Sequence, residues 1–550
     1  MRHYGIVALG GLAFLFAACG GDAQLEAALD TITAEELAAD VQVLSSDAFE
    51  GRAPASAGED STINYLKTRF EAVGAEPGNG DSYFQEVPLV SITADPSASL
   101  QIRGRGNTMR FRYADEFVAW TKRVVDSERI RNSELVFVGY GIVAPENDWN
   151  DYEGLDVTGK TVVILVNDPG FATQDTALFN GNTMTYYGRW TYKFEEAARQ
   201  GAAGAFVIHE TEPASYPWAT VRNSWTGPQF ALVADDNNMS RVAVEGWLSS
   251  ETAESVFERA GFDYDSLKTA AEQPGFQGVS LGLNASVSLR NTVVRSVSNN
   301  VIAVVPGSDR ADEYIVFTAH WDHFGKNESL EGDQIFNGAM DNATGISALI
   351  ELAQAFVNLE ERQSRSIVFM AVTAEEQGLL GSSYYATNPV YPLDKTVAAM
   401  NMDALNILGP MNDVSIVGYG NSELDGYLIE AAAHQNRVVI PEARPEAGSY
   451  YRSDHFSFAK VGVPALYANP GTDHKVHGPA WAKQRRDEYS ANHYHQPSDE
   501  YDANWDLSGA VDDIRVYFRV AYQIANETTF PNWSEGTEFK AIRDQMMRGR

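Results

Sequence analysis

The second half of the chain alternates short, continuously apolar runs with stretches of helical periodicity. The apolar runs cover 314–319, 367–372 and 397–402, and residues 346–357 between the first two place apolar side chains on one helical face. Runs that are apolar throughout are typical of strands buried on both faces of a parallel sheet. This alternation predicts an α/β fold, a mostly parallel-cored mixed sheet with helices on both faces.

Each of the three apolar runs is followed by residues that can bind a metal ion. The first run leads into His320 and Asp322, the second into Glu375 and Glu376, and the third into Asp403. Ligands of open α/β sheets collect beyond the carboxyl ends of the strands, so these side chains are expected to meet. Imidazole and carboxylate together suit Zn²⁺, and a carboxylate can bridge two ions about 3.5–4 Å apart.

Two further segments add possible ligands. Asp341 stands in the loop 338–345 that leads into the next helix, and His495 stands in the turn 494–499. Taken singly, such residues have ordinary roles, because Asp before a helix is a good N-cap and paired glutamates are usually solvated. Their joint placement near the strand ends indicates a metal site.

These residues belong to a set of short motifs. The motifs are His320-x-Asp322, Met340-Asp341-Asn342-x-x-Gly345, Glu375-Glu376 followed by Gly378, Asp403, Ser453-Asp454-His455 and Tyr494-His495. Together they resemble the signature of the co-catalytic zinc aminopeptidases of clan MH. That family includes bacterial leucyl-type aminopeptidases, glutamate carboxypeptidase II and the non-enzymatic transferrin receptor. The resemblance covers 31–115 and 291–530, which it implies are one zinc peptidase domain.

The resemblance implies two Zn²⁺ ions per chain. One would be held by His320 and Asp403 and the other by Glu376 and His495, and Asp341 would bridge them. His493 competes with His495, but the Tyr-His-x-x-x-Asp frame selects His495. His474, His477 and His493 are expected to lie in a polar surface loop, and His323 and His455 are expected to line the wall of the pocket.

The same resemblance implies three catalytic roles. Asp322 would orient His320 through its second ring nitrogen. Glu375 would be the general base, passing a proton from water at the zinc centre to the leaving amine. Tyr450, with Tyr451 as a competing choice, would stabilise the tetrahedral oxyanion. The implied reaction is hydrolysis of the N-terminal bond of peptides that have a free N-terminus.

Residues 116–290 have a different sequence pattern, in which short β-like runs are separated by Gly, Asn and Pro. This segment is expected to be an inserted β-rich domain, and Gly139-Tyr140-Gly141 with the stretch 156–160 resembles the protease-associated domain. Residues 531–550 are expected to form a C-terminal tail.

The first residues have the pattern of a lipoprotein leader. An apolar run too short to span a bilayer ends before Cys19, the only cysteine of the chain. We expect residues 1–19 to be a signal peptide, Cys19 to be acylated and 20–30 to be a tether. The protein would then be an exported bacterial lipoprotein, facing the periplasm or cell exterior on the outer membrane.

The acidic charge narrows the possible partners. The 75 Asp and Glu residues against 41 Lys and Arg give a formal charge of −34, which disfavours nucleic acid as a partner. The sequence leaves open a dipeptidase or carboxypeptidase on the same metal site, and a binding protein acting through the insert. A one-zinc glutaminyl cyclase is disfavoured by the full ligand set. The oligomeric state is left open.

Overall fold

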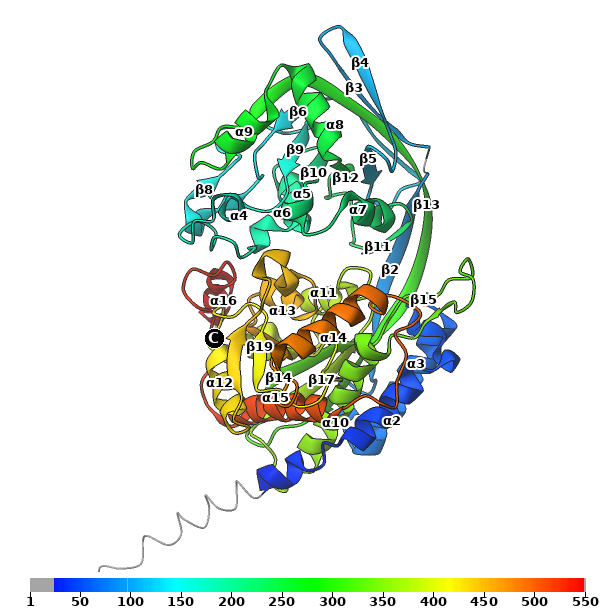
Figure 1. Cartoon of the computed structure of the whole chain (residues 1–550), viewed down its shortest axis with the longest axis vertical. Helices are drawn as coiled ribbons and strands as arrows, with labels where there is room; N and C mark the ends of the chain where they lie inside the picture. The colour runs from blue at the N-terminus through cyan, green and yellow to red at the C-terminus, as the bar shows by residue number, and fades with distance from the viewer. Residues whose placement is uncertain (1–23, 96, 549–550) are drawn as a thin grey trace, which may run out of the picture.

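The computed structural model describes residues 24–95 and 97–548 (Figure 1). The expected leader, the acylation site at Cys19 and the start of the tether lie outside these residues. Residues 24–29 are helical, and Ala28 and Leu29 are buried in the core. The expected tether over 20–30 therefore differs from the structure from residue 24 onward, because the apolar side chains there share one face of a helix.

The main sheet has a parallel centre. Its strands follow the order β13–β17–β14–β18–β21–β19–β20, and the four strands β17, β14, β18 and β21 are parallel. The bounds are β13 (Val279–Val305), β14 (Arg310–His320), β17 (Arg365–Val372), β18 (Thr396–Asn401), β19 (Asp413–Ile416), β20 (Val438–Pro441) and β21 (Ala465–Pro470). The predicted α/β fold with a mostly parallel-cored mixed sheet is confirmed, and the three predicted strands lie within β14, β17 and β18.

Helices cover both faces of this sheet because successive strand residues point to opposite sides. In β14, Ile315 and Phe317 belong to the core on one face, and Val316 belongs to the core on the other. The first face carries α2 (Ala34–Leu44), α3 (Ala57–Val73), α10 (Thr344–Val357), α12 (Leu424–Ala433) and α15 (Ser508–Asn526). The second carries α11 (Leu380–Thr387), α13 (His455–Lys460) and the segment before α16 (Lys540–Met547).

A second sheet lies above the main sheet in Figure 1. Its strand order is β4–β3–β13–β6–β9–β10–β12–β5, with β6, β9, β10 and β12 parallel. The strands are β3 (Ser99–Gly104), β4 (Asn107–Arg112), β5 (Phe117–Trp120), β6 (Ser127–Phe137), β9 (Thr161–Leu165), β10 (Gly204–Ile208) and β12 (Val244–Leu248). The helices α5 (Trp190–Arg199) and α7 (Trp218–Trp225) pack on one face, and α8 (Ser250–Ala260) and α9 (Tyr264–Ala271) pack on the other.

The second sheet begins earlier in the chain than the expected boundary at 116. Residues 99–112 form β3 and β4, which pair with β13 and with each other in this sheet. Leu100 and Phe111 are buried in its core. The alternation of apolar and polar residues in these strands predicts a half-buried strand but does not say which sheet it joins.

Two long strands connect the parts of the molecule. The 27-residue strand β13 runs from the second sheet into the main sheet, and β2 (Phe84–Ala94) pairs with its middle (Figure 1). The parts also touch away from these strands, since the backbone N–H of Tyr186 donates to Glu538 at 3.1 Å. Residues 531–548 are not a free tail, because Trp533 and Phe539 are buried in the core beneath α13. No helix in 24–95 or 97–548 is long and apolar enough to cross a membrane.

Candidate metal centre

The candidate metal centre lies in the middle of the main sheet, where successive strand connections run to opposite sides of β14. β14 comes first in the sequence but lies between β17 and β18. Such a switch point leaves a crevice at the carboxyl ends of the strands. His320 is the last residue of β14, Glu375 and Glu376 follow β17, and Asp403 follows β18. The predicted strand-end residues therefore meet at one edge.

Asp341 occupies the middle of the cluster. Its Oδ1 lies 3.2 Å from His320 Nε2, and its Oδ2 lies 3.3 Å from His495 Nε2. Asp403 Oδ1 lies 3.3 Å from the same nitrogen of His320, and Glu376 Oε2 lies 3.3 Å from that of His495. The five predicted ligands thus form two groups that share the two oxygens of Asp341.

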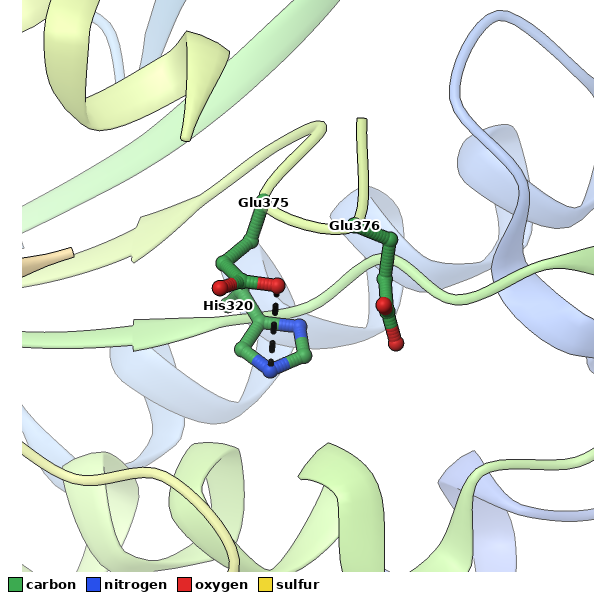
Figure 2. Close-up of side chains that lie close together, drawn as sticks. All are labelled: His320, Glu375 and Glu376. Carbon is green, nitrogen blue, oxygen red and sulfur yellow. Dashed lines mark ion pairs between the residues drawn. The ribbon is translucent and has the colours of Figure 1, made fainter. Parts of the chain in front are cut away.

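Glu375 and Glu376 come from one turn, but their carboxylates lie apart (Figure 2). Glu375 Oε2 lies 4.0 Å from His320 Nε2. The preceding Ala374 has a φ of 53°, the left-handed region that side chains other than Gly rarely adopt. The Asp322 carboxylate accepts the backbone N–H groups of Glu375 at 3.0 Å and Glu376 at 3.4 Å, which holds this turn.

The contact between Asp322 and His320 differs from the expected one. His320 Nδ1 lies 3.1 Å from the backbone carbonyl of Asp322 and 4.0 Å from its carboxylate. The carbonyl is therefore the group at hydrogen-bond distance, and it orients the ring as a carboxylate would. The carboxylate instead positions the glutamate turn.

Asp499 holds the loop that carries Asp341. Its carboxylate accepts the backbone N–H of Met340 and of Asp341, each at 3.1 Å, and the hydroxyl of Tyr489, also at 3.1 Å. Asp499 follows His495 by four residues, so one turn supplies a ligand and positions another. The Tyr-His-x-x-x-Asp frame is the sequence signal for this role.

Arg52 supports the centre from the N-terminal segment. The side chain is 1% exposed, and its guanidinium donates to the carbonyls of Trp321 at 2.8 Å, Asn337 at 2.6 Å and Gly338 at 2.8 Å. It thereby links the end of β14 to the loop before Asp341. The local sequence Glu50-Gly51-Arg52 does not predict these contacts, because the partner residues lie far away in the sequence.

We expect Arg52→Met to lower the free energy of unfolding by about 3–5 kcal/mol, the range for breaking a buried charged network. The reason is that the buried carbonyls of Trp321, Asn337 and Gly338 would lose a charged donor. Urea unfolding measures the change, with the exposed Arg131→Met as the matched control, for which about 0.5 kcal/mol or less is expected. Equal midpoints for the two variants would contradict this role.

Three further buried side chains lie near the centre. His323 and His455 were expected only to line its wall, and Asp454 was given no role. His323 Nδ1 lies 2.7 Å from Glu376 Oε1, so His323, Asp341 and Glu376 form a further group able to hold a cation. His323 Nε2 is buried and has no hydrogen-bond partner among the described residues. Asp454 accepts a hydrogen bond from Ser382 at 2.5 Å, and the His455 ring packs on Tyr450.

Tyr450 differs from its expected role. Its ring packs against His455 with centroids 4.6 Å apart, and the charges that act on its phenol are those of Glu538 and Asp425. The Tyr451 hydroxyl also turns away, donating to Glu538 at 3.2 Å. Neither phenol is directed at the ligand cluster, because the turn 449–451 buries both rings in the core under α13.

Tyr494 is the tyrosine that lies directly against a predicted ligand, with its side chain 40% exposed. Its ring stacks on His495 with centroids 3.7 Å apart. Burial raises the pKa of its phenol well above the ordinary value, and the carboxylates of Asp341 and Glu376 raise it further. The signal was present in the Tyr494-His495 pair, but only the fold shows which tyrosine faces the cluster.

The remaining histidines of this region lie elsewhere. His493 is half-buried, and its Nδ1 lies 3.0 Å from Ser498 Oγ. His474 and His477 stack on each other and on Trp481 beside α14 (Gly478–Asn492). The structure brings none of the three to Asp341.

The electrostatics of the cluster suit a cation. Burial raises the pKa of Glu375 and of Glu376 well above the ordinary value, and nearby carboxylates add to the rise. Burial by itself lowers the pKa of His320, but Glu375, Asp341 and Asp403 outweigh it and raise that pKa well above its ordinary value. Divalent cations would relieve the repulsion between these carboxylates, and the mixed imidazole and carboxylate donors are those that zinc prefers.

Comparison with known proteins agrees with this geometry. Residues 300–518 match the profile of Peptidase family M28, and they include all five predicted ligands. This part of the chain is therefore similar to that family.

Known proteins with similar sequences match this chain over part of their length. The mouse protein named aminopeptidase NAALADL1 is 29% identical over 138 residues, which is 24% of this chain and 17% of that protein. A glutamate carboxypeptidase 2 homolog of Caenorhabditis elegans is 33% identical over 212 residues, which is 36% of this chain and 25% of that protein. The matches thus span a quarter or less of these relatives.

A solved structure is similar over nearly the whole chain. The aminopeptidase from Aneurinibacillus sp. strain AM-1 is 19% identical, covers 91% of this chain and 96% of its own, and has a TM-score of 0.50. At this identity the likeness concerns the fold.

Proposed function

We propose that this protein is a di-zinc aminopeptidase, which hydrolyses the peptide bond next to a free N-terminus. The observation that carries the proposal is the position of Asp341. Its two carboxylate oxygens face two different histidines at 3.2 and 3.3 Å, each histidine with a second carboxylate beside it. A carboxylate shared between two such groups suits a pair of zinc ions about 3.5–4 Å apart.

His320 and Asp403 would hold one ion, and Glu376 and His495 the other, with Asp341 between them. Zinc in such a centre lowers the pKa of a bound water molecule and polarises the peptide carbonyl. The chain supplies the rest of the positioning, since Asp499 fixes the loop of Asp341 and Asp322 fixes the turn of both glutamates.

Glu375 would act as the general base and transfer the proton of the attacking water. Its carboxylate lies 4.0 Å from His320 Nε2 and is the strand-end carboxylate that the two ligand groups do not use. Burial raises the pKa of Glu375, so its carboxylate holds a proton more firmly than an exposed one. A carboxylate with these properties accepts a proton from water and delivers it to the departing amine.

A panel of peptides tests which end of the substrate is used. We expect purified protein to remove the first residue from peptides with a free N-terminus, and not from the same peptides acetylated at the N-terminus. A chelator should abolish the activity, and metal analysis should give two equivalents of zinc per chain. Cleavage of the acetylated peptides from the C-terminus would instead support a carboxypeptidase, and full activity without metal would exclude the whole proposal.

A further inference from the structure

One face of the second sheet carries a group of exposed arginines. The apolar residues of β3, β4 and β13 point towards α8, so the residues that alternate with them point to the opposite face. On that opposite face, α5 and α7 cover β9, β10 and β12, whereas the end formed by β4, β3, β13 and the first half of β6 is exposed. This basic face carries six arginines, which are Arg103, Arg110, Arg112, Arg129, Arg131 and Arg290.

Most of the arginines of the basic face have no acidic partner. Arg112 pairs with Glu116 at 3.3 Å, whereas the other five form no ion pair with a carboxylate in the part of the chain that the structure describes. The carboxylates of β6 pair with other cations, Glu128 at 3.1 Å and Glu134 at 3.2 Å. The basic face is therefore a local region of positive charge in a chain in which 75 acidic residues outnumber 41 basic ones.

The arginines stand on both sides of a polar hollow. β4 carries Arg110 and Arg112 on one side and β6 carries Arg129 and Arg131 on the other, with β3 and β13 between them. Because neighbouring strands are about 4.8 Å apart, the backbones of β4 and β6 lie about 14 Å from each other. The hollow between them has a volume of about 360 Å³, and its lining includes the hydroxyl and amide side chains of Ser99, Gln101, Ser286 and Ser288.

The chemistry of the basic face suits an acidic polysaccharide. Guanidinium groups match the paired oxygens of acid groups, and hydroxyl and amide groups donate and accept hydrogen bonds as sugar hydroxyls do. Membrane-binding surfaces insert apolar side chains and protein interfaces bury an apolar core, whereas the middle of this face is polar. The acidic residues elsewhere in the chain act weakly here, because physiological salt screens exposed charges beyond about 8 Å.

We propose that the basic face binds an acidic polysaccharide. The acid groups of the polymer pair with the arginines on the two sides, and its hydroxyls form hydrogen bonds with the side chains of the hollow. The strands β3 and β4 lie at the end of the molecule away from the main sheet (Figure 1). Binding there leaves the metal centre free, so the proposal does not depend on the peptidase function.

Binding of labelled oligosaccharides to the full chain tests the proposal. Polygalacturonate and heparin oligosaccharides supply carboxylate and sulfate groups, and neutral dextran of the same length is the uncharged control. We expect fluorescence anisotropy to show saturable binding of at least one acidic probe and none of dextran. The affinity should fall as the salt concentration rises, because the charges of the face are exposed. If neither acidic probe binds, the proposal is wrong.

Charge-reversal variants connect the binding to the basic face. The double variant Arg110→Glu with Arg129→Glu changes one arginine on each side, and the affinity should fall about 10-fold or more because two attractions become repulsions. The matched control is Arg362→Glu with Lys483→Glu, which reverses two exposed charges of the main part. It should bind as the unmodified protein does, and thermal unfolding should verify that both variants are folded. Equal losses of affinity in the two variants would contradict the proposal.

Two other polyanions test the class of partner. Poly-glutamate represents an acidic protein segment, and vesicles that contain phosphatidylglycerol represent an acidic membrane. We expect both to bind more weakly than the acidic polysaccharide, because neither offers a row of sugar hydroxyls to the hollow. Gln101→Ala with Ser288→Ala should accordingly weaken the polysaccharide and leave poly-glutamate unaffected. If poly-glutamate or the vesicles bind as tightly as the polysaccharide, the partner belongs to another class and the proposal is overturned.

Discussion

Asp341→Asn should leave the protein folded but without its pair of zinc ions. The carboxylate of Asp341 lies 3.2 Å from His320 and 3.3 Å from His495, so its neutral amide would weaken both ion sites at once. We expect kcat/KM to fall by at least about 10³-fold, because a metal centre supplies several kcal/mol of transition-state stabilisation. Metal analysis and peptide hydrolysis on the same preparation measure the two effects.

Single-ligand variants test how the two groups divide the ions. His495→Ala should lose about one equivalent of zinc, whereas His493→Ala, two residues away, should keep both because His493 contacts Ser498. His323→Ala is the sharper comparison, because His323 also contacts Glu376. If His323→Ala loses zinc and His495→Ala does not, the assignment of the second ion is wrong.

Glu375→Gln should separate catalysis from metal binding. The glutamine keeps the size and shape of the side chain but removes its basicity, so kcat should fall by about 10²–10⁴-fold, the span of general acid–base catalysis. The zinc content and KM should change little, because the lost interaction belongs to the transition state. Single-turnover hydrolysis of a free N-terminal peptide, with metal analysis of the same sample, measures the effect.

The matched control for this variant is the neighbouring residue. Glu376→Gln should lose zinc together with activity, since Glu376 contacts His495 at 3.3 Å. Exchange of the two phenotypes would reverse the assignment of the two glutamates. Full activity of Glu375→Gln would exclude its role as the general base.

Much of the main sheet can be predicted because its strands are apolar on both faces. That pattern needs no knowledge of the partners, and β14, β17 and β18 lie where it places them. The ends of helices also depend on residues close in the sequence. Thr33 caps α2 by accepting the N–H of Glu36, and Gly74 ends α3 in the left-handed conformation.

The sequence alone determined which residues could meet at the centre, because a parallel sheet brings the carboxyl ends of its strands to one edge. The tertiary structure decided the contacts that depend on distant segments. It turned Tyr450 away and Tyr494 towards the cluster, and it brought Arg52 beneath the loop of Asp341. It also joined β3 and β4 to the second sheet. Periodicity reports which face of an element is buried, whereas the packing of distant segments decides what that face meets.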